Sequence, residues 1–511
     1  MKARIQFLGG VAGDLTGSCY YLTVSEGKKC IRILFDSGLI QCSFNDSLDK
    51  NQEILNHLNL AEIDYIVLTH SHIDHIGRLP LFVKNGFKGR IICTIGTKSL
   101  LGVMLEDSAK IQMAEASYLN AKAAKDKNPV NSRKGNTRNC LTRGNYDRVK
   151  RKGAEQKCKK CLPLYTTADA EEAQKLVKNG GYEYHQWTRL AHNLHLKFYP
   201  SGHVMGGAIA VVKIDNKPKA MYMCFSGDLG RRDGIILPPP EIVTEAIDYL
   251  VIESTYGGQT HPERDQEIEK LLNLIKLSHE KNKRIIIPSF ALERSQEIIY
   301  LLSYYMAEGI IPKIPIYLDS PLGAKITEIF SAGWTQGMFS DQAKLKFNPF
   351  CPEENPYFNL VVTPKESEAL IAKSGNYIVI AGSGMCDAGR VRGHLRSNLA
   401  KSDTMVFLVG YMAERSLGRR LKDGKTIKMN GQEIKVQAEI LIFDSFSAHA
   451  DGKFLVDYAK EVSTSNIFKR IFIVHGEGEG AKKLKIDLEN IFSKSTTKIN
   501  IPKIYEDFTI N

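Results

Sequence analysis

Four side chains that can bind a metal ion lie within six residues of this chain, in the run HSHIDH at residues 70–75. The run has the pattern H-x-H-x-D-H and follows an apolar segment, 63–68, that is typical of a β-strand. Histidine and aspartate rarely pack together in a core unless they bind something, and imidazole beside carboxylate suits zinc or a similar divalent ion. The run therefore predicts a metal site at a strand end, in preference to an exposed polar loop.

Further acids and histidines follow other apolar segments in the same way. Asp36 ends one such segment, His203 follows segment 194–199, and Asp228 follows segment 220–225. Polar turns after strands are where the chemistry of an α/β scaffold tends to lie. Any one of these residues alone is more often structural. Two metal ions need about three ligands each and a carboxylate that bridges them, so the whole set predicts a binuclear site.

The order of the expected elements indicates more than one domain, since 511 residues are too many for a single core. Short strands alternate with glycine-rich turns up to residue 257, and longer helices alternate with buried strands over 258–435. The second pattern is typical of a parallel sheet. Short strands return over 436–511. We therefore expect an α/β chain in which domain 258–435 is inserted into a host domain made of 1–257 and 436–511.

The location of the protein is predicted from its apolar segments and its cysteines. No apolar run approaches the ~18 residues that cross a bilayer, and nothing resembles a secretory leader. Most of the ten cysteines stand singly in apolar segments, as buried free thiols do in a reducing compartment. We expect a cytoplasmic protein that does not contact a membrane.

The positive charge of the chain is concentrated in one stretch, residues 122–160. This stretch has fourteen lysines and arginines against three acids, which accounts for +11 of a net charge of +12. A stretch this basic can bind a polyanion: it can tether RNA through salt-dependent affinity, or dock on a structured RNA or a ribonucleoprotein. The alternative is a solvated loop whose charge serves solubility.

Three cysteines in or beside the basic stretch, Cys140, Cys158 and Cys161, have a spacing that a small structural zinc site can use. A fourth ligand is not evident in the sequence. Free surface thiols are the alternative to an extra zinc ion at Cys158 and Cys161.

The order of Asp36, the H-x-H-x-D-H run, His203 and Asp228 resembles the metallo-β-lactamase fold, an αββα sandwich with metals at one edge of its sheets. That fold serves lactam, thioester and phosphodiester hydrolysis, so it leaves the substrate open. Three later segments resemble motifs A, B and C of the β-CASP nucleases. They are ESTYG at 253–257, SFSAHAD at 445–451 and VHGE at 474–477.

Four more segments agree with the β-CASP pattern, at 288–297, 318–321, 381–390 and 409–420. The resemblance covers essentially the whole chain except 122–160. It is closest to the group that contains the endonuclease subunit of the cleavage and polyadenylation specificity factor and its prokaryotic relatives. It implies an α/β fold class: an αββα metallo-β-lactamase sandwich with an inserted parallel α/β β-CASP domain.

The resemblance also implies a ligand set for two zinc ions in one active site. The first ion would be held by His70, His72 and His203. The second would be held by Asp74, His75 and His475. Asp228 would bridge both ions, and Asp36 would orient a ligand histidine through its other ring nitrogen.

The resemblance further implies a reaction, the hydrolysis of a phosphodiester by a water that the two ions activate. His449, polarised by Glu253, would be the general acid that protonates the leaving 3′ oxygen. Together with the metal-binding Asp74 and Asp228, these two residues form the predicted catalytic set. The products would carry 5′-phosphate and 3′-hydroxyl ends.

The residue at motif C indicates the substrate, because RNA-acting members tend to have histidine there and DNA-acting members valine. His475 therefore favours single-stranded RNA, and hence RNA processing or decay. The alternatives are a DNA nuclease of the same superfamily and an RNA-binding scaffold that has lost catalysis, which would need a missing ligand. An endonuclease is favoured over a 5′–3′ exonuclease. The RNA target and the oligomeric state, including a homodimer, are left open.

The segment after strand 377–380 is a candidate for binding a substrate phosphate through backbone N–H groups. A tight strand-to-helix turn is the alternative interpretation. The candidate phosphate-binding residues are Ser383, Gly384, Met385, Arg390 and Arg419, although exposed arginines are usually only solvated.

Overall fold

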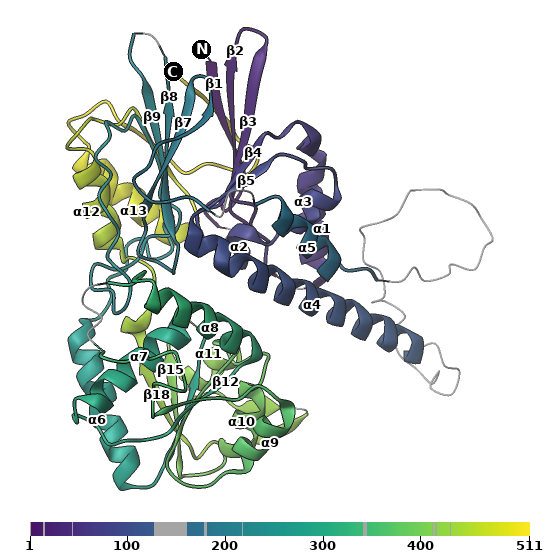
Figure 1. Cartoon of the computed structure of the whole chain (residues 1–511), viewed down its shortest axis with the longest axis vertical. Helices are drawn as coiled ribbons and strands as arrows, with labels where there is room; N and C mark the ends of the chain where they lie inside the picture. The colour runs from purple at the N-terminus through teal and green to yellow at the C-terminus, as the bar shows by residue number, and fades with distance from the viewer. Residues whose placement is uncertain are drawn as a thin grey trace.

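The computed structural model describes residues 2–13, 16–42, 44–126, 161–177, 181–216, 218–340, 345–410, 412–413, 416–429 and 431–511. Residues 127–160 of the basic stretch, with Cys140 and Cys158, lie outside the described residues. The described chain forms two lobes (Figure 1). No helix among these residues is long and apolar enough to cross a membrane.

The first lobe contains two mixed sheets that pack face to face. One sheet has the order β21 (Asp507–Ile510), β1 (Lys2–Gly9), β2 (Cys19–Glu26), β3 (Lys29–Phe35), β4 (Tyr65–Val67) and β5 (Arg90–Ile92). The other has the order β20 (Lys498–Asn500), β19 (Arg470–Ile473), β10 (Tyr249–Ile252), β9 (Met221–Phe225), β8 (Ala208–Ile214), β7 (Leu194–Pro200) and β6 (Thr188–Ala191). Alternate residues of β1, such as Ile5 and Phe7, pack against Phe198 and Phe225 of the second sheet.

Helices cover the two outer faces of this sandwich. The first sheet is covered by α1 (Phe44–Glu53), α3 (Leu79–Lys84), α4 (Ile95–Asp126) and α5 (Thr167–Lys175). The second is covered by α12 (Gly452–Val462) and α13 (Gly478–Ile491), whose apolar sides form a further buried cluster with the sheet. Because both of its faces are covered, β8 is a nearly continuous apolar run and not an alternating one. The layers are those of an αββα sandwich.

The second lobe is a parallel six-stranded sheet between two groups of helices. Its strand order is β13 (Phe358–Leu360), β12 (Ile316–Asp319), β14 (Ile378–Ala381), β11 (Arg284–Pro288), β15 (Thr404–Val409) and β18 (Glu439–Phe443). One face is covered by α6 (Arg264–Glu280), α7 (Arg294–Ala307) and α8 (Pro321–Thr335). The other is covered by α9 (Pro364–Ala372), α10 (Val391–Asn398) and α11 (Leu417–Lys422). A small hairpin, β16 (Ile427–Met429) and β17 (Gln432–Ile434), completes the lobe.

The predicted fold class, a sandwich with an inserted parallel α/β domain, is confirmed by these layers. The chain leaves the first lobe after β10 and returns to it at α12. Strand β18 pairs with β15 in parallel, so the second lobe includes residues up to Phe443 and extends beyond the boundary predicted at 435. The first and last strands, β1 and β21, pair antiparallel, with Ala3 opposite Ile510.

Helix α4 runs along the junction of the two lobes, with α8 beneath it (Figure 1). Lys325 of α8 forms an ion pair with Glu106 of α4, at 3.0 Å between Nζ and Oε2. Nearby, the backbone N–H of Met205 donates to Glu293 Oε2 at 3.1 Å. Both contacts join the first lobe to the second, and they hold the second lobe against this edge of the sandwich.

Candidate metal centre and active site

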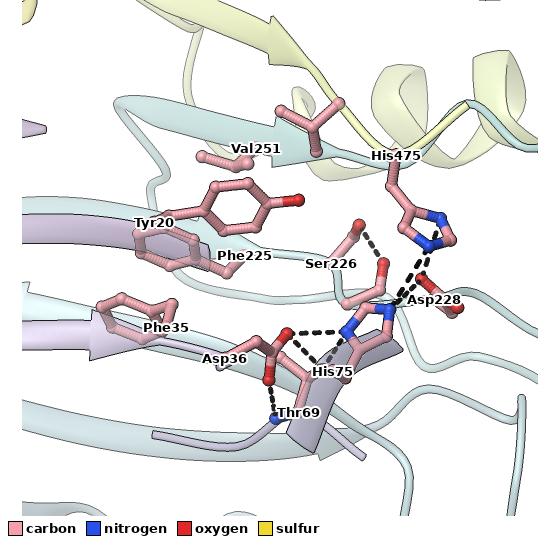
Figure 2. Close-up of a pocket in the computed structure, with 12 residues that line it drawn as sticks. Tyr20, Phe35, Asp36, Thr69, His75, Phe225, Ser226, Asp228, Val251 and His475 are labelled. Carbon is pink, nitrogen blue, oxygen red and sulfur yellow. Dashed lines mark hydrogen bonds and ion pairs between the residues drawn. The ribbon is translucent and has the colours of Figure 1, made fainter. Parts of the chain in front are cut away.

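The predicted site residues come from turns at the ends of six strands. Asp36 follows β3, the 70–75 run follows β4, and His203 and Asp228 follow β7 and β9. Glu253 and His475 follow β10 and β19, which are parallel neighbours. Because parallel strands end at the same edge of a sheet, residues far apart in sequence meet there. Figure 2 shows His75, Asp228 and His475 converging at this edge.

The first predicted ligand group is brought together around three imidazole nitrogens. His70 Nε2 and His203 Nε2 lie 3.1 and 3.2 Å from His72 Nδ1. The same two Nε2 atoms lie 3.6 and 3.7 Å from Asp228 Oδ2. These four side chains therefore present one ligand atom each to a common point.

The second predicted group uses the other oxygen of Asp228. His75 Nε2 is 3.3 Å from Asp228 Oδ1 and 3.4 Å from His475 Nε2, which in turn is 3.3 Å from Asp74 Oδ2. Each oxygen of the Asp228 carboxylate thus faces a different group. This is the arrangement expected of a bridging ligand.

The chemistry of the donors fits two metal ions. Ligands on a tetrahedral zinc ion, with bonds of ~2.0–2.1 Å, lie about 3.3–3.4 Å apart, close to the separations of the nitrogens. Asp228 Oδ1 is buried and makes no hydrogen bond of regular geometry; only the ring nitrogens of His75 and His475 face it, at 3.3 and 3.4 Å, where a metal ion could bind between them. The set is nitrogen and oxygen only, which suits zinc and other divalent transition-metal ions. The assignment of these residues as ligands stays a prediction.

Two residues behind the groups fix the orientation of the imidazoles. Asp36 Oδ2 accepts a hydrogen bond from His75 Nδ1 at 2.8 Å, which leaves Nε2 facing the site (Figure 2). Thr69 donates through its hydroxyl to Asp36 Oδ2 at 2.8 Å and lies 3.2 Å from His70 Nδ1. Because the Thr69 hydroxyl donates its proton to Asp36, its oxygen can accept a hydrogen bond from His70 Nδ1–H. His70 Nε2 then keeps a lone pair that can bind a metal ion.

Burial and charge set the protonation of these groups. Burial lowers the pKa of His72 to about 4 and lowers the pKa values of His70 and His203 well below the usual value. These three imidazoles are therefore neutral at pH 7, the form that binds metal. Burial also acts against a charge on His75, but the carboxylates of Asp228 and Asp36 outweigh it and raise the pKa of His75 well above its usual value. A metal ion in the second group must therefore displace a proton.

The backbone around the run is tightly packed at Gly38, and substitution there should disturb the site. A Cβ on Gly38 would lie 1.5 Å from the carbonyl oxygen of Asp74. We expect Gly38→Ala to lower the free energy of unfolding by about 1–3 kcal/mol, as overpacking does, and to reduce bound metal. Thermal unfolding and metal analysis measure both effects. Gly478→Ala is the control, because a Cβ there meets nothing within 4 Å. Unchanged metal content in Gly38→Ala would contradict this view.

The predicted general acid, His449, lies beside the first ligand group. Its ring centroid is 4.4 Å from that of His203, and its Nδ1 is 3.3 Å from Glu253 Oε1. Burial alone would lower the pKa of His449, but the Glu253 carboxylate outweighs burial and raises that pKa to about 9. His449 therefore holds a proton at neutral pH. Because Nδ1 is bonded to Glu253, Nε2–H is the proton that remains for a substrate.

Of two residues that the sequence did not single out, His261 supports this pair and Thr69 supports the metal-binding run. His261 Nε2 lies 3.1 Å from the carbonyl oxygen of His449, and its backbone N–H donates to Asp451 Oδ2 at 3.2 Å. Thr69 forms the contacts with Asp36 and His70 described above. The sequence carries no signal for His261, since its partners lie about 190 positions away. Thr69 adjoins the metal-binding run, which was the one available hint.

The candidate phosphate-binding residues are arranged as a closed turn. Ser383 N–H donates to the Ala388 carbonyl at 3.1 Å, and the Met385 carbonyl accepts from Gly418 N–H at 3.0 Å. A Cβ on Gly384 would lie 2.9 Å from the Phe290 ring. The tight turn that was the alternative interpretation is therefore present, and binding of a phosphate by this segment stays a prediction.

The two candidate arginines are already paired. Arg390 donates to Asp319 Oδ1 at 2.6 Å and to the carbonyls of Val361 and Val362. Arg419 Nε donates to Asp423 Oδ1 at 2.9 Å. Through these contacts Arg390 stabilises the second lobe. Contact of either arginine with a phosphate stays a prediction.

One of the three cysteines considered for a structural zinc site is described. Cys161 is partly exposed as a free thiol, and its backbone N–H and carbonyl are both bonded to the Asn120 side chain, at 2.8 and 2.9 Å. The zinc hypothesis for Cys158 and Cys161 stays a prediction, because Cys158 lies outside the described residues.

Three family models match the chain in the order of its lobes. The metallo-β-lactamase superfamily matches residues 12–137, the β-CASP domain matches 295–421, and the zinc-dependent metallo-hydrolase RNA specificity domain matches 433–502. The last match covers both His449 and His475.

Curated relatives match over most of their length. Ribonuclease TTHA0252 of Thermus thermophilus is 28% identical over 92% of this chain and 92% of its own. Transcription termination factor FttA of Methanosarcina mazei is 26% identical over 97% of this chain and 71% of its own. An RNase J-like protein of Methanocaldococcus jannaschii is 25% identical over 88% of this chain and 90% of its own. The sandwich, the inserted parallel domain and these matches agree, and the chain belongs to the β-CASP ribonuclease family of the metallo-β-lactamase superfamily.

Proposed function

We propose that this protein is a zinc-dependent ribonuclease that hydrolyses single-stranded RNA to 5′-phosphate and 3′-hydroxyl ends, in RNA processing or decay. The observation that carries the proposal is the Asp228 carboxylate, whose two oxygens face two separate groups of ligands beside the His449–Glu253 pair. A two-metal site next to a protonated imidazole has the parts that phosphodiester hydrolysis requires.

Each residue of the site would have a separate role in metal binding or proton transfer. His70, His72 and His203 would hold one ion, Asp74, His75 and His475 the other, and Asp228 both. Bound there, the ions would supply a nucleophilic water and stabilise charge on the phosphoryl oxygens. Glu253 keeps His449 protonated and oriented, and His449 Nε2–H donates its proton to the departing 3′ oxygen. The His261 ring, through its contact with the His449 carbonyl oxygen, holds the backbone of His449 in place.

RNA is favoured as the substrate by two findings. His475, the residue at motif C, is placed between Asp74 and Asp228. The relatives include proteins named ribonuclease and RNase J-like, and an RNA specificity domain matches the C-terminal part. All the predicted metal ligands are present in the chain, which argues against an RNA-binding scaffold that has lost catalysis. A DNA nuclease of the same superfamily remains the alternative that an assay must exclude.

The proposal is tested by matched single strands of RNA and DNA in linear and circular form. We expect cleavage of RNA and little cleavage of DNA. Cleavage of circular RNA would identify an endonuclease, and cleavage restricted to linear RNA with a 5′ end would identify a 5′–3′ exonuclease. Equal cleavage of DNA and RNA would contradict the assigned substrate. The cytoplasmic location, a homodimer and a ribonucleoprotein contact stay predictions.

The pH dependence of cleavage should report the His449–Glu253 pair. Glu253 raises the pKa of His449, so Glu253→Gln should lower it. A general acid is active only when protonated, and the rate should therefore fall at a lower pH on the alkaline side in Glu253→Gln than in the wild type. The pH profile of kcat at saturating RNA measures this shift. An alkaline limb that does not move would mean that His449 is not the acid.

A further inference from the structure

A cavity of about 240 Å³ lies beside the metal centre, at the junction of the two lobes. Its walls come from the segment after Asp36, from α1, from α4 and from α8 of the second lobe, the helix beneath α4 in Figure 1. The apolar part of the lining includes Leu39, Leu48, Ile73, Met104, Ile111, Leu164 and Leu322. The volume is below the ~300–1,000 Å³ of pockets that hold drug-sized molecules, and it suits a single ring system.

The cavity is tied to the site by one residue of the metal-binding run. Ile73 lines the cavity, while its chain neighbours His72 and Asp74 belong to the first and second ligand groups. A nucleotide strand with a phosphate at the metal centre would therefore have a base within reach of this cavity. Leu322 of α8 brings the second lobe into the lining, so the cavity lies where the two lobes meet.

One buried polar group in the lining lacks a partner. Gln112 is 7% exposed, and its Oε1 has no hydrogen bond. The other end of the amide is held, since Nε2 donates to Ser108 Oγ at 3.4 Å, and Ser108 is bonded to Tyr165 at 2.8 Å. A buried carbonyl oxygen without a donor is costly, so a ligand that supplies an N–H group is favoured.

The charge of the lining excludes a phosphate as the occupant. Asp107 and Glu115 also line the cavity, and both are acids. The nearby cations are engaged elsewhere, because Lys110 and Lys325 both pair with Glu106. Apolar walls with acceptors at one side match the ring and the amino edge of a nucleobase, and single-stranded RNA is commonly read through bases that are splayed out in this way.

We propose that this cavity binds one base of the RNA substrate and prefers bases with an exocyclic amino group, namely adenine, cytosine and guanine, over uracil. An exocyclic amino group offers two N–H donors, one for Gln112 Oε1 and one for the Asp107 carboxylate, and the leucines and Ile73 contact the ring. Uracil offers only N3–H, and the two carbonyl oxygens beside that group would face these acceptors unfavourably. The inference rests on the proposed ribonuclease function and adds a specificity to it.

The test is cleavage of a random pool of single-stranded RNA by the zinc-loaded full-length protein, with the cut ends sequenced. We expect the amino-bearing bases to be enriched over uracil at one fixed distance from the cut. Gln112→Met should reduce that discrimination by about tenfold, the size of one base-specific contact. Leu48→Trp, which places a larger side chain in the cavity from α1, should abolish the same preference.

The matched control is Gln296→Met. Gln296 is fully buried and also has an unpartnered Oε1, but it lies in α7 and does not line the cavity. The Gln296→Met variant should keep the base preference of the wild type. A pool cut without preference at any fixed position would overturn the inference and leave the ribonuclease function standing, as would a preference that survives in both Gln112→Met and Leu48→Trp. Absence of any RNA cleavage would overturn both proposals.

Discussion

Replacing Asp228 by asparagine is expected to abolish RNA cleavage and to release metal from both ligand groups. The carboxylate is buried at 2% exposure, and each of its oxygens faces a different group. An amide of the same shape carries no charge and offers one acceptor in place of two. Because metal ions contribute several kcal/mol to stabilising the charge of the transition state, kcat/KM should fall by at least ~10³-fold.

Metal analysis and cleavage assays on the same preparation measure both effects of Asp228→Asn. The control is Asp248→Asn, a change of another buried carboxylate, which accepts the backbone N–H of Tyr222 at 3.0 Å between β9 and β10. Asp248→Asn should keep its metal and its activity. Asp228→Asn with a full complement of metal would show that Asp228 is not a ligand of both ions.

Replacing His449 by alanine is expected to remove most of the activity while metal content stays intact. His449 belongs to neither ligand group, and its hydrogen bond runs to Glu253. General acid catalysis typically contributes ~10²–10⁴-fold, so kcat should fall by that amount. Loss of metal together with activity would mean that His449 supports the ligands and is not the acid.

A second substrate separates the acid role of His449 from a structural one. Bis(4-nitrophenyl) phosphate releases a phenolate that needs no proton to depart. His449→Ala should therefore cleave it at a rate close to that of the wild type, while losing activity on RNA. Equal losses on both substrates would contradict a proton-donating role and would indicate that the variant has a disturbed site.

The sequence indicates candidate site residues where each residue has a local signature. The 70–75 run, Asp36, His203 and Asp228 all follow apolar segments, and each of these segments is a strand or borders one in the structure. Their convergence follows from parallel neighbours that end at one edge. His475 also follows an apolar strand, but it joins the run from 400 positions away, and only the resemblance to a known motif predicts its place in the site.

The features that the sequence does not reveal depend on contacts between distant segments. The cavity at the lobe junction combines α1, α4 and α8, which show nothing unusual in sequence. Arg390 looks like a phosphate contact in its motif, but its guanidinium bonds to Asp319 from β12. The lobe boundary near 435 also shifts, because an apolar strand such as β18 can join either sheet and only packing decides which.

The central claim is that two zinc ions held by this strand-end cluster enable the hydrolysis of RNA. The most direct measurement is cleavage of one defined single-stranded RNA by protein that is stripped of metal and then titrated with zinc, with the end groups of the products determined. We expect no cleavage by the stripped protein, full recovery at two zinc ions per chain, and products with 5′-phosphate and 3′-hydroxyl ends. Cleavage that persists without metal, or products with 2′,3′-cyclic phosphate ends, would contradict the central claim.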